Sequence, residues 1–146
     1  MAKFVKIQHA FHHNMIHILV YTTGVCNYNC EYCSFGSMRN DKFLNLNVLY
    51  NFLDNLYNLR RQKIYVELIG GEPTLDKNIL LFAKKIYENG NITLGIYTNF
   101  SKPFNLYYEL AKYNVDLTLT WHSLVNDFSN TQFIKNADKL LNSNIN

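Results

Sequence analysis

The fold of this chain follows from one stretch, KIYVELIGGEPTLDKNILLFAKKIYENG, at residues 63 to 90. Residues 63 to 71 are a short apolar and β-branched run closed by two glycines, which predicts a buried strand. Residues 76 to 90 predict a helix that ends at Gly90, a residue suited to a C-terminal cap. The apolar side chains of this helix recur on one face: Ile79, Phe82, Ala83 and Ile86. A buried strand followed at once by an amphipathic helix is the repeating unit of parallel sheets.

The same alternation continues on both sides of this stretch. Further strands are predicted at residues 15 to 23, 92 to 100 and 115 to 123. Further helices are predicted at residues 47 to 59, 105 to 114 and 131 to 143, the last capped near Ser129 or Asn130. The first of these helices is expected to bury its recurring apolar side chains: Val48, Leu49, Phe52, Leu56 and Leu59. Four βα units predict an α/β fold with one parallel sheet covered by helices. We expect a single domain of residues 1 to 146, in which residues 1 to 14 form an arm or an extra strand.

The composition argues against several function classes. The net charge is only +3, and the lysine and arginine residues are scattered, so no nucleic-acid-binding face is expected. No run approaches the roughly 20 apolar residues of a membrane span, and the first residues lack the apolar core of a signal peptide. We therefore expect a cytoplasmic protein whose thiols stay reduced.

All three cysteines of the chain lie in CNYNCEYC, residues 26 to 33, directly after the first predicted strand. Ligands of parallel α/β folds gather at the carboxyl ends of strands, so this stretch is a candidate site. Cys26, Cys30 and Cys33 are compatible with a disulfide that leaves one thiol over, a zinc site completed by a histidine, a catalytic thiol, or an iron–sulfur cluster. Three thiolates around a cubane leave one iron open, and an open coordination position is typical of catalytic metal sites.

CNYNCEYC and GGEPTL, residues 70 to 75, together resemble the two motifs of the radical S-adenosylmethionine (radical SAM) superfamily, in the same order and after the same strands. The resemblance implies a partial (β/α) barrel in which Cys26, Cys30 and Cys33 hold a [4Fe-4S] cluster whose open iron binds S-adenosylmethionine. It implies reductive cleavage of this cofactor to a 5′-deoxyadenosyl radical, which abstracts hydrogen from a small molecule, peptide or nucleotide. A flavodoxin or ferredoxin is the expected electron donor.

The resemblance also implies roles for residues at the strand ends. Tyr32 matches an aromatic position that packs by the adenine of the cofactor. Gly70, Gly71 and Glu72 match the segment that meets its methionine amino group. Glycines there let the backbone approach a ligand, and a carboxylate accepts hydrogen bonds from an ammonium group.

Two later strand ends are expected to contribute cofactor contacts. Thr98 and Asn99 partly match a Thr-Asn-Gly turn that proteins of this superfamily often carry at the corresponding strand end, with Phe100 in place of the glycine. At the end of the next strand, Ser123 or His122 is expected to contact the cofactor, whereas Trp121 is expected in the core.

Other residues and readings stay open. Tyr65 or Glu67 is expected to face the barrel interior, and the remaining histidines are expected to be solvated or partly buried rather than ligands: His9, His12, His13 and His17. Because the family's core usually has more than four βα units, the chain is interpreted as a fragment, a compact member or a decayed copy. A glycyl-radical-enzyme activase and an iron–sulfur or zinc-binding module without turnover are the alternative functions.

Overall fold

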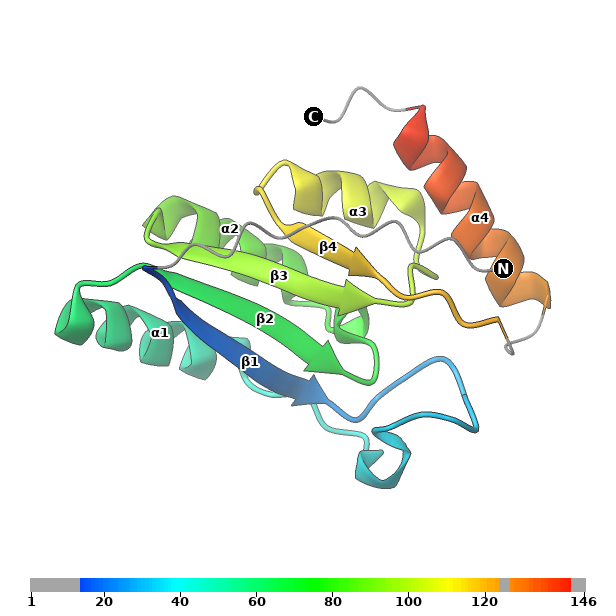
Figure 1. Cartoon of the computed structure of the whole chain (residues 1–146), viewed down its shortest axis with the longest axis horizontal. Helices are drawn as coiled ribbons and strands as arrows, with labels where there is room; N and C mark the ends of the chain where they lie inside the picture. Colours follow the sequence, from blue (N-terminus) through cyan, green and yellow to red (C-terminus); the bar gives the residue numbers. More distant parts are fainter. Residues whose placement is uncertain (1–13, 124–126, 143–146) are drawn as a thin grey trace.

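The computed structural model describes residues 14 to 123 and 127 to 142, which form one sheet with helices packed beside it (Figure 1). The strands are β1 (Ile16–Thr23), β2 (Ile64–Gly70), β3 (Ile92–Thr98) and β4 (Asp116–Leu119). The helices are α1 (Leu46–Arg60), α2 (Ile79–Asn89), α3 (Phe104–Ala111) and α4 (Asp127–Leu141), with short 3-10 turns η1 (Gly36–Met38) and η2 (Pro73–Leu75). Within these described ranges, we find no helix with the length and apolar character needed to cross a membrane.

The sheet is parallel throughout, with its strands in the order β1-β2-β3-β4. The helices α1, α2 and α3 each connect one strand to the next. The predicted α/β architecture of four βα units is therefore confirmed, and it is consistent with a partial barrel. Because all the strands run in the same direction, their carboxyl ends meet at one edge of the sheet.

The hydrophobic core lies between the sheet and the helices α1, α2 and α3, which cover one face (Figure 1). Alternate residues of each strand enter it, as Ile64, Val66 and Leu68 do from β2. The predicted face of α2 is confirmed, because its four recurring apolar residues are all buried: Ile79, Phe82, Ala83 and Ile86. Gly90 ends this helix in the left-handed conformation, as expected.

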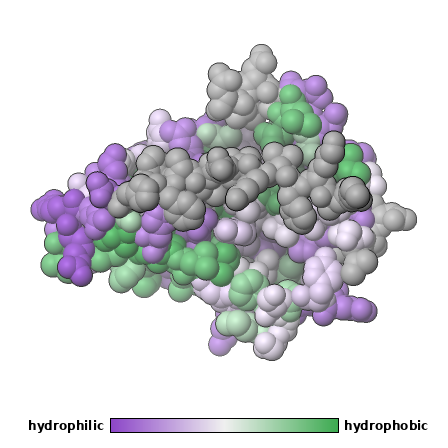
Figure 2. Space-filling view, in the orientation of Figure 1, coloured by the Kyte–Doolittle hydropathy of each residue, from purple (hydrophilic) through white to green (hydrophobic). Residues whose placement is uncertain are grey.

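The predicted buried face of α1 is largely wrong. Leu46, Leu49 and Leu53 are buried. In contrast, Val48 and Phe52 are 61% and 54% exposed, and Leu59 is exposed as well. Both stripes are apolar at helical spacing, so periodicity alone does not decide which one faces the core. Apolar side chains gather on the surface along β1 and α1 (Figure 2), where Leu19 of the edge strand is also exposed.

Tyr65 and Glu67 share the opposite face of the sheet, so the expectation that only one of them faces inward is wrong. Residues two apart on a strand point the same way. A Cβ at Gly95 of β3 would lie 2.8 Å from the Tyr65 hydroxyl and 3.1 Å from Cγ of Glu67. The ring of His17 in β1 packs beside Tyr65 on this face, with centroids 5.3 Å apart.

Several predicted boundaries shift. β3 ends at Thr98 and β4 at Leu119, so the residues after them form loops rather than strand. α4 begins at Asp127, four residues earlier than predicted. Trp121 is not a core residue: it is 44% exposed, and its ring meets that of Phe133 of α4 edge-on, with ring centroids 4.9 Å apart. The predicted arm, with His9, His12 and His13, lies outside the described residues.

Candidate functional site at the carboxyl edge of the sheet

The two sequence motifs are hydrogen-bonded to each other. The cysteine loop (residues 24 to 33) follows β1, and the Gly-Gly-Glu turn (residues 70 to 72) follows β2, the neighbouring strand. The amide of Gly71 donates to the carbonyl oxygen of Thr23 (2.7 Å), and the amide of Glu72 donates to that of Val25 (2.8 Å). These bonds extend the β1–β2 ladder beyond the strands, so the loop and the turn form one unit.

This junction requires the two glycines. A Cβ at Gly71 would lie 2.1 Å from the carbonyl oxygen of Val25 and 3.1 Å from Cβ of Cys26. Gly70 has a φ of +139°, which other residues rarely adopt, and a Cβ there would lie 2.3 Å from the carbonyl oxygen of Thr23. The sequence predicts that these glycines make room for a ligand. The structure shows that they make room for the end of β1 and for the start of the cysteine loop, and their contact with a ligand stays a prediction.

The three cysteines are free thiols with partly exposed side chains, so the disulfide reading is not borne out. The amide of Cys33 donates to the carbonyl oxygen of Cys30 (3.2 Å), which winds the second half of the loop into a turn. The amide of Tyr28 donates to Sγ of Cys26 (3.4 Å). Burial raises the pKa of the Cys26 thiol, while this amide opposes the shift.

Two residues that the sequence did not single out brace the cysteine loop. The side-chain oxygen of Asn27 accepts a hydrogen bond from the amide group of the Asn99 side chain (2.9 Å), which follows β3. The guanidinium group of Arg39 donates to the carbonyl oxygen of Tyr28 (3.1 Å) and to the side-chain oxygen of Asn29. Asn27 and Asn99 are 72 positions apart, so no local pattern could have revealed their contact.

The carboxylate of Glu72 is fully buried, at 0% exposure. Oε1 accepts hydrogen bonds from the amide and hydroxyl of Thr74 (3.1 and 2.5 Å) and from the hydroxyl of Thr98 (2.8 Å). Oε2 accepts from the amide of Asn99 (2.7 Å). Burial raises the pKa of this carboxyl, and the hydrogen bonds work against that rise. The carboxylate joins the turn after β2 to the end of β3, and its contact with an ammonium group stays a prediction.

Thr98 and Asn99 lie buried at the end of β3, and Phe100 follows them with a left-handed φ of +57°. That conformation is easy for glycine and unusual for a bulky residue. The ring of Phe100 is fully buried, with centroids 4.3 Å from Tyr107 and 5.6 Å from Phe133. The turn therefore has a backbone suited to glycine, and core packing holds phenylalanine in it.

His122 comes from the segment after β4 and reaches the cysteine loop. Its Nδ1 lies 3.5 Å from Sγ of Cys30 and 3.1 Å from the hydroxyl of Tyr32. The ring stacks on Tyr32, with centroids 6.1 Å apart, and meets Tyr28 edge-on at 5.5 Å. Burial lowers the pKa of His122. Of the two residues expected at this strand end, His122 lies beside the loop. Ser123 is exposed, and its cofactor contact stays a prediction.

Comparison with known protein families agrees with this arrangement. The model of the radical SAM superfamily matches residues 20 to 139, a range that contains both motifs and every strand end described above. This chain belongs to the radical SAM superfamily.

Three curated proteins illustrate where the chain's similarity lies. It is 35% identical over 89 residues to an uncharacterized protein of Methanocaldococcus jannaschii, covering 58% of this chain and 30% of that protein. It is 31% identical over 100 residues to a GTP 3′,8-cyclase of Edwardsiella ictaluri, covering 64% of this chain and 30% of the cyclase. A GTP 3′,8-cyclase of Pasteurella multocida is 31% identical over 87 residues, covering 57% and 25%. The chain thus matches less than a third of the length of each relative.

Radical SAM proteins generally use a [4Fe-4S] cluster and S-adenosylmethionine, and the residues present fit that cluster. Three free thiols on one loop are the donor set of a cubane with one open iron. In the part of the chain that the structure describes, no three His, Cys, Asp or Glu side chains converge as ligands of one metal ion. A zinc ion would need such convergence. A cubane does not, because each cysteine binds a different iron.

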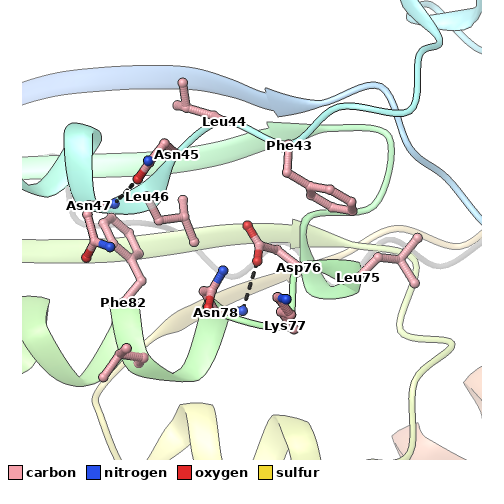
Figure 3. A pocket seen from close by; sticks show the side chains of 11 residues that line it. Phe43, Leu44, Asn45, Leu46, Asn47, Leu75, Asp76, Lys77, Asn78 and Phe82 are labelled. Atoms are coloured by element: carbon pink, nitrogen blue, oxygen red, sulfur yellow. Dashed lines mark hydrogen bonds between the residues drawn. The ribbon is translucent and has the colours of Figure 1, made fainter.

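A surface pocket of about 450 Å³ lies between the N-terminal ends of α1 and α2 (Figure 3). Phe43, Leu46 and Phe82 form part of its lining. Its polar atoms are used locally: Asn45 accepts from the amide of Asn47 (3.0 Å) at the start of α1. Neither the cysteines nor the Gly-Gly-Glu turn lines this pocket, although Leu75, the last residue of the GGEPTL motif, does.

Proposed function

We propose that this chain carries the cluster- and cofactor-binding core of a radical SAM enzyme. The observation that supports this most strongly is the hydrogen-bonded junction that joins the loop carrying three free thiols to the Gly-Gly-Glu turn. When bound, the [4Fe-4S] cluster and S-adenosylmethionine would supply the one-electron cleavage that gives methionine and a 5′-deoxyadenosyl radical, which abstracts hydrogen from the substrate.

The residues of the chain would contribute binding and orientation. Cys26, Cys30 and Cys33 would hold the cluster, and the backbone of Gly70 and Gly71 would face the cofactor at the same sheet edge. Tyr32, Thr98, Asn99 and Ser123 are the other proposed cofactor contacts, of which Thr98 and Asn99 are held in place by Glu72. The helices packed on the sheet would exclude water from one side of the site.

The test is anaerobic reconstitution of the full chain with iron and sulfide. We expect a [4Fe-4S] cluster in the wild type and formation of 5′-deoxyadenosine when S-adenosylmethionine and dithionite are added. Cys30→Ala is expected to lose both, and Ser34→Ala, an exposed position in the next turn, is expected to keep both. A cluster without 5′-deoxyadenosine would favour the binding module without turnover. Wild-type protein that takes up no iron would refute the proposal.

GTP is the first substrate that we propose to test, because two of the similar proteins are named GTP 3′,8-cyclases. If GTP is the substrate, adding GTP should raise the rate of 5′-deoxyadenosine formation and give a new product detectable by mass spectrometry. ATP should do neither. Reduced flavodoxin or ferredoxin is the proposed electron donor, and either one replacing dithionite in the same assay would support that part. Equal rates with GTP and ATP and no new product would exclude GTP.

A further inference from the structure

The ring of His122 is held against the cysteine loop from two sides. It stacks on Tyr32 at an interplanar angle of 23° and meets Tyr28 at 89°. Its Nδ1 lies 3.5 Å from Sγ of Cys30 and 3.1 Å from the hydroxyl of Tyr32. With two aromatic side chains packed against the ring, Nδ1 lies within reach of both the Cys30 sulfur and the Tyr32 hydroxyl.

The chemistry of that contact depends on what Cys30 becomes. A cysteine that binds iron is a thiolate, which only accepts hydrogen bonds. A bare Nδ1 could accept from the Tyr32 hydroxyl, but it would turn its lone pair toward a negative sulfur, which is unfavourable. A protonated Nδ1 would donate to the sulfur instead. The contact is therefore favourable in the cluster-bound protein when the proton of the neutral imidazole is on Nδ1.

Hydrogen bonds to ligand sulfurs are among the features that set the reduction potential of an iron–sulfur cluster. Reduction adds an electron, and a donor beside the sulfur stabilises the added negative charge. The outer-shell partners of a metal site tune it in the same way. A donor at Cys30 therefore makes the cluster easier to reduce.

We propose that His122 is a positioning residue that donates a hydrogen bond from Nδ1 to the sulfur of Cys30 and thereby raises the reduction potential of the cluster. This inference rests on the proposed function, since it needs the cluster. It assigns His122 a role toward the cluster rather than toward S-adenosylmethionine. The reaction concerned is the uptake of one electron by the oxidised cluster from a chemical reductant.

The test measures the midpoint potential of the reconstituted full chain by dithionite titration followed by electron paramagnetic resonance, without S-adenosylmethionine. His122→Phe keeps a ring and removes the donor, so we expect its reduction to become about tenfold less favourable, a shift of about 59 mV to lower potential for one electron. His122→Asn places an amide N–H near the position of Nδ1 and is expected to restore most of the potential. Trp121→Phe is the matched control, because Trp121 packs on Phe133 instead of the loop, and it is expected to leave the potential unchanged.

The outcomes separate this inference from the proposed function. A wild-type chain that binds no iron overturns both. An intact cluster with the same potential in wild type and His122→Phe overturns only the inference. If His122→Phe fails to assemble the cluster, pulsed electron paramagnetic resonance of the reduced wild-type protein with ¹⁵N-labelled histidine provides the test. A weak ¹⁵N coupling is expected, and either no coupling or the strong coupling of an iron-bound nitrogen overturns the inference.

Discussion

Replacing Glu72 with alanine removes the acceptor of four hydrogen bonds at the centre of the site. The hydroxyls of Thr74 and Thr98 can rotate toward other acceptors, but the amides of Thr74 and Asn99 cannot. Each buried donor left without a partner costs about 1–3 kcal/mol, so the two amides together cost about 2–6 kcal/mol. Losing a desolvated carboxylate, whose burial raises its pKa, offsets part of this cost. We expect the free energy of unfolding to fall by about 2–4 kcal/mol, out of the roughly 5–15 kcal/mol typical of a domain.

Urea unfolding of the cluster-free chain, followed by circular dichroism, measures this loss. Glu72→Gln is the graded variant: its oxygen can still accept from Thr74 and Thr98, but its NH₂ group faces the amide of Asn99, so a smaller loss is expected. Glu88→Ala is the control. Glu88 is an exposed residue of α2 whose ion pair with Lys84 spans 3.7 Å, and its removal should change stability by less than about 0.5 kcal/mol. A loss below about 1 kcal/mol for Glu72→Ala would refute the role assigned to the carboxylate.

Three further predictions concern the same edge of the sheet. Gly71→Ala should push the turn away from Val25 and destabilise the fold by about 1–3 kcal/mol. It should also lower the iron bound per chain after reconstitution, and normal iron uptake would show that the junction tolerates a side chain. Phe100→Ala should lower the free energy of unfolding, measured in urea, by about 3–5 kcal/mol, because it leaves the space of a buried ring empty. A loss below about 1 kcal/mol would mean that packing of the Phe100 ring contributes little to the stability of the fold. Burial raises the pKa of Glu72 in the folded chain, so as the pH falls the folded chain binds this proton before the unfolded chain does. The stability of the wild type relative to Glu72→Gln should therefore rise as the pH falls from the raised folded-state pKa toward the ordinary pKa of a glutamate. Urea midpoints of both proteins across that pH range measure this difference, and an opposite slope would contradict the prediction.

Local patterns in the sequence determined most of the architecture. The alternation of β-branched runs with amphipathic stretches predicted four βα units, and α2 buries the four residues that were predicted from its helical spacing. Both motifs were predicted to lie at the carboxyl ends of strands, and parallel strands present those ends at one edge of the sheet. Periodicity failed on α1, where two apolar stripes compete and contact with α2 and the sheet chooses between them.

The sequence by itself therefore determined the α/β fold, the order of the motifs and the three thiols that are candidate cluster ligands. Only the tertiary structure decided which groups meet those motifs: His122 beside Cys30, 92 positions away, Asn99 on Asn27, and the Glu72 carboxylate turned into the protein. The physical reason is that periodicity records only which face of an element is buried. Contacts across the sheet edge depend on strand register and on where each strand stops, and the packed fold sets both.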